Sequence, residues 1–288
     1  MNKVRFAFSG VSFEVSSETP FTITKNFNPF LTENNKADYR LQYSSRSSLG
    51  DVNGEMLYEG LEYDVVQKAD GKIIRIFKDP KEDYVYASAE FDMDEKIVNI
   101  SYLRGAEQYF DTTNNSFFHS GWEQLLAWSG RMILHASLIE TEFGGILFSG
   151  VSGVGKSTQA DLWMQYESAG LINGDRPIVY KKAGKWFASG SPYAGSSECY
   201  INKSIPIRAI IFLQQGNETR LERVKITEAV KRLYANCTVY TWDKTYIEKI
   251  FTRITELAAE VPIYYLVNKA DASSVEAVKK EMKKDVAV

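Results

Sequence analysis

The stretch GILFSGVSGVGKSTQADLWMQY, residues 145–166, decides the fold class of the region around it. Its first apolar residues, 145–148, are typical of a buried strand, and the pattern that follows Lys156 is typical of a helix. Between them, Gly150-Val-Ser-Gly-Val-Gly-Lys-Ser matches the phosphate-binding pattern GxxxxGK[ST]. We therefore expect a strand, a glycine-rich loop and a helix in succession, which is the context this motif needs.

The loop predicts a nucleotide site, with ATP or another nucleoside triphosphate and Mg²⁺ as cofactors. Its glycines let backbone N–H groups turn inward around a phosphate, and the helix N-terminus adds positive potential. Lys156 is expected to reach the β- and γ-phosphates, and the Ser157 hydroxyl to ligate Mg²⁺. The alternative is a glycine-rich turn that binds no ligand. The predicted cofactor-binding residues are Gly150, Ser152, Gly153, Val154, Gly155, Lys156, Ser157, Thr158 and Arg176.

A reaction at this loop also needs a carboxylate, and Asp175 is the leading candidate. It follows a short apolar segment, 171–172, after the predicted helix, and ligands of α/β sheets gather at the carboxyl ends of strands. Asp175 would hold Mg²⁺ or accept the proton of an attacking hydroxyl, and Arg176 would neutralise phosphate charge. The alternative is an Asx-turn aspartate beside a solvated arginine.

Residues 135–176 resemble the HPr serine kinase/phosphorylase family, a P-loop kinase group related in fold to phosphoenolpyruvate carboxykinase. The resemblance rests on His135-Ala-Ser-Leu-Ile-Glu, on the SGVGKS core of the loop, and on Gly174-Asp175-Arg176. It implies an α/β P-loop kinase domain with a mixed sheet, and it places His135 beside the phosphates as a catalytic residue with Asp175 and Lys156. For His135 alone, a partly buried strand histidine bonded to a carbonyl is the alternative.

Two positions depart from the pattern of that family. Gly174 stands where the family has the first of two aspartates, so Asp175 would do the work of both. The later Leu-Glu-Ile-Arg-Gly signature is absent, and the segment in its region, 190–198, has Glu198 as its one carboxylate. The resemblance thus implies Ser157, Asp175 and Glu198 as metal-side residues. The phosphoryl acceptor would be a serine-type hydroxyl of a peptide or protein, or a small molecule.

Asn268-Lys-Ala-Asp271 spells the NKxD pattern with which GTPases recognise guanine. Against that function, Asp175-Arg-Pro-Ile lacks the glycine of a DxxG motif, and Asp271 or Ser273 can serve as the N-cap of the last helix. We therefore expect adenine, or weak selection of the base. A nucleotide-dependent switch, and a P-loop scaffold without transfer activity, remain the alternative functions.

Upstream of this region the chain is β-rich. Asp70-Gly71 and Asn53-Gly54 are hairpin signals. We expect an antiparallel meander or small barrel in a domain 1–114, followed at the polar stretch 111–116 by a kinase-like domain 115–288. The expected strands of the first domain are 4–8, 21–24, 39–43, 63–67, 72–77, 84–89 and 97–102.

Downstream, strands and helices are mixed. The capping box Ser120-Gly-Trp-Glu123 predicts a helix to about residue 129. The expected strands are 132–140, 145–149, 178–180, 186–188, 208–213 and 263–267, and the further expected helices are 156–166, 227–236, 243–259 and 274–284.

Composition narrows the class of protein. The 288 residues are 44% hydrophobic and 25% charged, which is ordinary for a soluble globular protein, and a net charge of −3 gives no reason to expect nucleic acid. No apolar run approaches the roughly 20 residues of a membrane helix, and the N-terminus lacks a signal-peptide pattern. The two distant cysteines favour reduced thiols. We expect a cytoplasmic protein with no nucleic-acid or membrane partner, and a homo-oligomer stays open.

Overall fold

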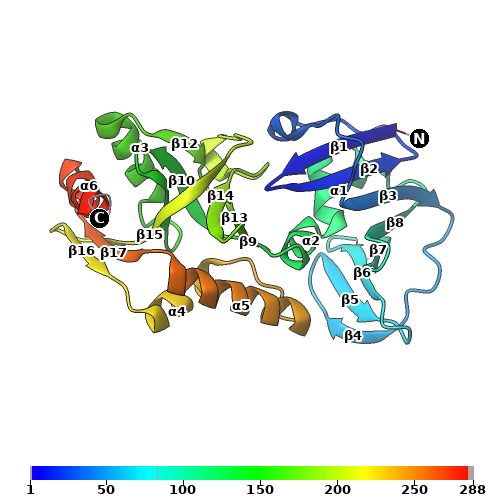
Figure 1. The fold of residues 1–288 in the computed structure, drawn as a ribbon. Coiled ribbons are helices and arrows are strands. Elements are labelled where there is room, and N and C mark those ends of the chain that lie inside the picture. Colours follow the sequence, from blue (N-terminus) through cyan, green and yellow to red (C-terminus); the bar gives the residue numbers. More distant parts are fainter. Residues whose placement is uncertain (1, 83, 285–288) are drawn as a thin grey trace. The chain divides into compact units, whose positions relative to one another are not determined.

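The computed structural model describes residues 2–82 and 84–284, which divide into two compact units (Figure 1). The N-terminal unit runs to Leu125 and includes Thr241–Asp243. The C-terminal unit holds Leu126–Tyr240 and the chain from Lys244 onward. The predicted boundary between 114 and 115 lies inside helix α1 (Thr113–Ser120), ahead of this division.

The N-terminal unit is built on a sheet in the order β1-β2-β3-β8-β7-β6-β5-β4. The predicted β-rich character is confirmed, but the sheet is mixed, because β3 runs parallel to both β2 and β8. The expectation of an antiparallel meander is therefore wrong at the centre of the sheet. The strands are β1 (Asn2–Phe8), β2 (Val11–Ser17), β3 (Tyr39–Arg46), β4 (Glu55–Tyr58), β5 (Tyr63–Gln67), β6 (Ile73–Asp79), β7 (Tyr84–Asp92) and β8 (Ile97–Leu103).

Aromatic side chains fill the core of this unit. The ring of Phe117, on α1, lies 4.6 Å from the ring of Phe27, and it also contacts the rings of Phe6, Phe8 and Phe13. Full burial of one such side chain stabilises the fold by about 2–3 kcal/mol. Two short 3-10 helices, η1 (Lys25–Phe30) and η2 (Glu107–Phe110), supply further buried rings.

Helix α1 occupies the stretch that the sequence marked as a polar boundary. The Thr112 hydroxyl accepts a hydrogen bond from the backbone N–H of Asn115 and caps the helix. Ser120 ends α1 instead of starting the next helix: its hydroxyl donates to the carbonyl of Phe117, and Gly121 has the left-handed φ of 64° that closes a helix. Helix α2 (Trp122–Trp128) follows, so the predicted helix exists but its predicted capping box is wrong.

Two further local predictions fail in this unit. Residues 21–24 form a single bridge, from Thr22 to Thr112, and no strand. Asn53-Gly54 precedes β4 without joining two paired strands, since β4 pairs with β5. The hairpin at Asp70-Gly71 is confirmed, and there Gly71 takes the left-handed φ of 85°.

The C-terminal unit has a mixed α/β architecture, as predicted. Its sheet runs in the order β12-β10-β11-β15-β14-β13-β9, and β17 pairs in parallel with the later part of β15 and antiparallel with β16. The strands are β9 (Arg131–Ile133), β10 (Ala136–Thr141), β11 (Gly144–Ser149), β12 (Gly170–Asn173), β13 (Ile178–Lys182), β14 (Lys185–Ser189), β15 (Ser204–Gln215), β16 (Arg220–Arg223) and β17 (Ile263–Asn268).

Four helices cover the two faces of this sheet (Figure 1). Helices α3 (Lys156–Glu167) and α6 (Ala272–Lys284) share one apolar cluster that includes Trp163 and Met282. Helices α4 (Ile226–Asn236) and α5 (Lys244–Glu260) share another, which includes Leu233 and Ile254. With both faces covered, the edge where β11, β12, β15 and β17 end is the part of the sheet open to a ligand.

One predicted strand, 132–140, is broken in two. Between β9 and β10, the N–H of Leu134 donates to the carbonyl of Pro177, and the N–H of His135 donates to the carbonyl of Asn236. These bonds to distant segments hold His135 directly before the first residue of β10.

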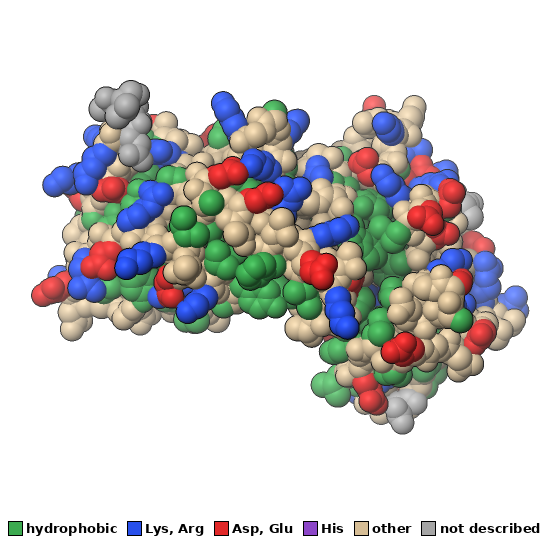
Figure 2. Space-filling model, turned by 60° about the horizontal axis from the view of Figure 1, so that its bottom comes forward, with side chains coloured by type: hydrophobic (Ala, Val, Ile, Leu, Met, Phe, Trp, Pro, Cys, Tyr) green, Lys and Arg blue, Asp and Glu red, His purple; other side chains and the backbone are tan. Residues whose placement is uncertain are grey.

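The surface carries charges of both signs. On the face drawn in Figure 2, Lys and Arg side chains are interspersed with Asp and Glu, as a balance of 34 to 37 leads one to expect. None of the helices in residues 2–82 and 84–284 combines the length and the hydropathy that crossing a bilayer requires.

Candidate functional site

The glycine-rich loop 150–157 joins β11 to α3, as the sequence predicts for a phosphate-binding motif. Gly153 and Gly155 have φ angles of 77° and 105°, in the region that side chains with a Cβ rarely adopt. Val154 is buried in the core shared by α3 and α6, so its backbone alone can serve a ligand. Ser152, Ser157 and Thr158 are exposed on the loop and the first turn of α3.

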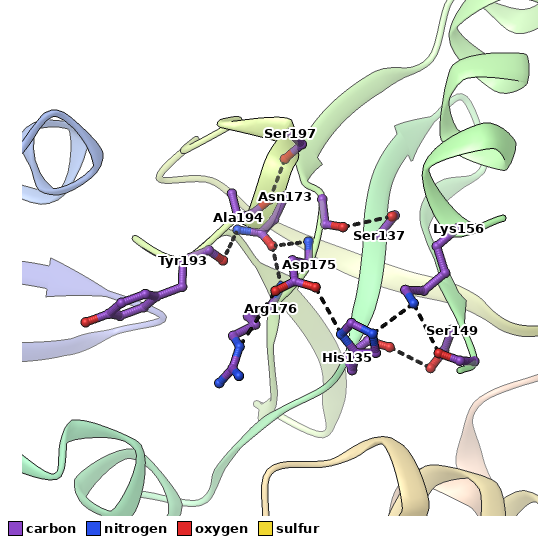
Figure 3. A network of polar contacts seen from close by, with 12 residues as sticks. His135, Ser137, Ser149, Lys156, Asn173, Asp175, Arg176, Tyr193, Ala194 and Ser197 are labelled. Carbon is purple, nitrogen blue, oxygen red and sulfur yellow. Dashed lines mark hydrogen bonds and ion pairs between the residues drawn. The ribbon is translucent and has the colours of Figure 1, made fainter. Parts of the chain in front are cut away.

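Lys156 lies folded against this loop. Its side-chain ammonium donates to the carbonyls of Gly150 and Val151, at 3.1 and 3.2 Å, and to Nε2 of His135 at 2.9 Å (Figure 3). Burial lowers the pKa of Lys156, and the nearby Asp175 carboxylate opposes that shift. The ammonium is thus held at the loop, close to where the phosphates of a nucleotide would lie.

His135 connects Lys156 to Asp175. Its Nδ1 lies 3.0 Å from Oδ1 of Asp175. Because Nε2 accepts a bond from the Lys156 ammonium, Nδ1 carries the proton and donates to the carboxylate. The backbone of His135 is held as well, since its carbonyl accepts from the Ser149 hydroxyl at 2.8 Å. The result is a continuous line of ammonium, imidazole and carboxylate across two strands.

Asp175 follows β12, which runs parallel to β11 because both pair antiparallel with β10. The bond from His135 lowers the pKa of the Asp175 carboxyl group, while burial acts in the opposite direction. Arg176 is exposed, with its Nε 3.7 Å from Oδ2 of Asp175. The structure therefore brings His135, Lys156, Asp175 and Arg176 together from three different segments.

Asn173 is a site residue that the sequence analysis missed. It is fully buried, and its Oδ1 accepts from the backbone N–H groups of Asp175 and Arg176, at 3.1 and 2.8 Å. Its Nδ2 donates to the carbonyls of Ser191 and Tyr193, both at 3.2 Å. Asn173 therefore fixes the Asp175 turn and the following segment in one arrangement. The signal in the sequence was Asn173-Gly174, a turn dipeptide at the end of a strand.

The segment 190–197 explains why Gly174 has no side chain. A Cβ on Gly174 would lie 2.2 Å from Oγ of Ser197, so an aspartate cannot stand there without moving the short helix η3 (Gly195–Ser197). Gly195 in turn lies against Asp175, where an added Cβ would come within 2.9 Å of the Asp175 Cβ. The segment packs on the Asp175 turn and takes the space that a second acid would need.

Glu198 follows η3 with a φ of 47° and an exposed side chain. Within residues 2–82 and 84–284, no three His, Cys, Asp or Glu side chains form a cluster that could hold a metal ion by themselves.

Cavities flank the glycine-rich loop on two sides. One, of about 650 Å³, lies between loop residues 150–154, the end of β15 and the side chains of Lys231 and Arg232 on α4. The second, of about 610 Å³, lies between loop residues 153–155, Thr158 and the loops that follow β15 and β17. The loop thus has room for ligand groups on both sides.

Comparison with known proteins gives a matching family model and matches among solved structures. No curated protein matches the sequence. The HPr(Ser) kinase/phosphatase from Coxiella burnetii is 12% identical and matches over 44% of this chain and 92% of its own, with a TM-score of 0.23, which supports no structural argument. The family model of the SynChlorMet cassette protein ScmC matches residues 123–283, more than half of the chain. The chain therefore belongs to the ScmC family of SynChlorMet cassette proteins.

Proposed function

We propose that the protein is a Mg²⁺-dependent, ATP-binding phosphotransferase, a P-loop kinase resembling HPr serine kinase. Its acceptor would be a serine-type hydroxyl of a peptide or protein, or a small molecule. The observation that carries the proposal is the line from Lys156 on the glycine-rich loop, through His135, to Asp175. A phosphate-binding lysine and an ionised carboxylate on one sheet edge are what transfer of a phosphoryl group to a hydroxyl requires.

In this proposal each side chain has a distinct part. The acceptor oxygen bonds to the γ-phosphorus as the bond to the β-phosphate oxygen breaks, and the proton of the hydroxyl passes to Asp175. His135 donates to that carboxylate and fixes its direction. Lys156 and Arg176 neutralise charge on the phosphate oxygens.

The donor set fits Mg²⁺ held in the manner usual for nucleotide enzymes, by one or two protein oxygens together with phosphates. The Ser157 hydroxyl would hold it, with Glu198 as a further acid on the metal side, and Asp175 would be a ligand in place of its role as the base. When bound, the ion neutralises charge on the phosphate oxygens. A cytoplasmic location belongs to the same proposal, in keeping with free thiols at Cys199 and Cys237.

The test is paired measurement of nucleotide affinity, by calorimetry, and of turnover, by phosphate release and by transfer from labelled ATP to candidate acceptors. Lys156→Ala should weaken nucleotide binding and lower turnover by about 10³, whereas the exposed Lys185→Ala on β14 should change neither. Unchanged affinity and turnover in Lys156→Ala would overturn the kinase proposal.

One observation favours an alternative, a nucleotide-binding module that does not transfer phosphate. Ser197 takes the place of a second acid beside Gly174, so the site has a single carboxylate where two would share the work. Such a scaffold or nucleotide-dependent switch would bind ATP through Lys156 but phosphorylate no acceptor, and Asp175→Asn would leave its properties unchanged.

A further inference from the structure

The loop after β17 carries a sequence motif, Asn268-Lys-Ala-Asp271, that the proposed catalytic groups do not use. Strand β17 runs parallel to β15, and β15 runs parallel to β11. The loop after β17 therefore reaches the same sheet edge as the glycine-rich loop. It lies two strands away from β11 on one side, as the Asp175 turn lies two strands away on the other.

A nucleotide bound at the glycine-rich loop would therefore lie between the Asp175 turn on one side and the loop after β17 on the other. Its γ-phosphate would lie toward Asp175, so its nucleoside would extend to the opposite side of the loop. The cavity of about 610 Å³ lies on that side, and its size falls within the range of about 300–1,000 Å³ typical of small-molecule sites. We propose that this cavity holds the base and ribose of a purine nucleotide, an inference that rests on the proposed nucleotide binding at the loop.

The outer wall of the cavity is held in place by Asn268, which is 5% exposed. Its Oδ1 accepts from the N–H of Ala270 at 2.9 Å, and its Nδ2 donates to the carbonyl of Gln214 at 3.3 Å. The carbonyl of Asn268 accepts from the N–H of Gly216 at 3.0 Å. The loops after β15 and β17 are therefore bonded to each other before any ligand arrives.

The same wall is tied to the phosphate-binding helix. Gln159, in the first turn of α3, is fully buried and donates to Oδ1 of Asn268 and to the hydroxyl of Ser274, at 3.3 and 2.8 Å. Gln215 also donates to the carbonyl of Gly153 at 3.2 Å. The phosphate loop and the nucleoside cavity therefore form one bonded frame, as a ligand that spans both would require.

The chemistry of the lining suits a nucleoside better than a further phosphate. It offers the Thr158 hydroxyl, the amides of Gln215 and Asn217, backbone groups, and Lys269 as its one cation. Amides and hydroxyls can bond both to the edge of a purine and to ribose hydroxyls. The alkyl stem of the exposed Lys269 gives an apolar surface for the face of the base.

The lining does not select guanine through Asp271. Oδ1 of Asp271 accepts from the backbone N–H of Ser273 at 3.0 Å and from its hydroxyl at 2.5 Å, which caps α6. Oδ1 is thus engaged by the helix, and Oδ2 lies 3.7 Å from the ammonium of Lys269. We therefore expect ATP and GTP to bind with similar affinities. The presence of a nucleoside should change the binding affinity much more than the identity of its base does.

The experiment separates the nucleoside from the phosphates. Affinities of the full chain for ATP, GTP and inorganic tripolyphosphate, each with Mg²⁺, are measured by calorimetry on wild type, Asn217→Trp, Lys269→Ala and Lys231→Trp. Asn217→Trp fills the proposed cavity from an exposed loop, and Lys231→Trp is the matched change in the cavity beside α4. Wild type should bind ATP and GTP with similar affinities, both tighter than tripolyphosphate.

Asn217→Trp should weaken ATP and GTP about tenfold or more, a loss of about 1.4 kcal/mol, while tripolyphosphate binding stays unchanged and shows that the chain is folded. Lys269→Ala should weaken the same two ligands by less. Loss of ATP affinity in Lys231→Trp with no loss in Asn217→Trp would overturn the assignment and move the nucleoside to the other cavity. Failure of wild type to bind any of the three ligands would instead overturn the proposed function itself.

Discussion

The two histidines of the chain lie in different units and in opposite surroundings. In the N-terminal unit His119 is 3% exposed among the rings of Phe77 and Phe110. Its Nδ1 donates to the carbonyl of Asn115 and its Nε2 accepts from the Tyr86 hydroxyl. In the C-terminal unit the side chain of His135 is 38% exposed and lies between a carboxylate and an ammonium.

Both imidazoles have a partner on each nitrogen, but the partners of His119 are neutral and those of His135 are charged. Neutral partners and burial fix His119 in one uncharged form, and burial lowers its pKa to about 4. Under the proposed function, the charged partners of His135 are already in place to stabilise charge that develops during transfer. The predictions below test this contrast, from the largest expected effect to the smallest.

The largest effect is expected when the Lys156 ammonium, which donates to His135, is removed. Lys156→Ala should lower any ATPase or transfer rate by about 10³. The variant lacks the positive charge that would stabilise the transferring phosphoryl group in a site partly shielded from water. The melting temperature should change little, since the loop backbone remains. Phosphate release and thermal unfolding measured on the same preparations check both statements, and a rate equal to that of wild type would contradict the first.

Acid should destabilise the N-terminal unit through His119. With a pKa of about 4 when folded and about 6.5 when unfolded, the unfolded chain binds more protons between these values. The contribution of His119 to the free energy of unfolding is therefore fully present above about pH 6.5. It is lost as the pH falls toward about 4, by about 3 kcal/mol in total. Urea unfolding at a series of pH values checks this, with His119→Gln as the variant that should flatten the slope.

The titration can also be followed directly. In a chain with two histidines, nuclear magnetic resonance of labelled imidazoles should show that His119 stays uncharged down to about pH 5. A His119 signal that titrates near 6.5 would contradict the structural assignment of this residue.

Removing the charge of the carboxylate beside His135 should reduce turnover more than binding. Asp175→Asn keeps the shape of the side chain but no longer accepts a proton, so the rate should fall by about 10² while ATP affinity stays within a few-fold of wild type. Asp161→Asn, an exposed change on α3, is the matched control. Equal rates in both variants would assign Asp175 to the turn alone.

The smallest effect is expected at the cap of α6. Asp271→Ala removes the acceptor for the Ser273 N–H and should cost about 1 kcal/mol of stability. The ratio of ATP to GTP affinity should not change, because that carboxylate serves the helix. A variant that loses GTP selectively would show instead that Asp271 contacts the base.

The features that could be predicted from the sequence are those that short local motifs encode. The strand, loop and helix around Lys156 follow from glycines at fixed spacing and from apolar runs on either side, all within about twenty residues. Asp175 could be singled out because the end of a strand in an α/β sheet is a known ligand position. These inferences needed no knowledge of which segments meet across the fold.

What the sequence did not predict depends on distant partners. The break at His135 exists because its N–H donates to the carbonyl of Asn236, about one hundred residues away in the sequence. The parallel pairing of β3 with β8 rests on a register that no local pattern specifies. Nor could the sequence assign His119 to a core, since its burial comes from rings on separate strands and helices.

Because Thr241–Asp243 belongs to the N-terminal unit, truncation of the chain between the two units affects both pieces. Within that unit the Asp243 carboxylate accepts from the Gln124 amide at 2.7 Å, and Arg75 lies over the Trp242 ring. A clone that stops at Leu125 discards these partners, and one that starts at Leu126 keeps them without the surface they pack on. The N-terminal unit is therefore discontinuous along the gene, and no reading frame that ends before Thr241 encodes all of it.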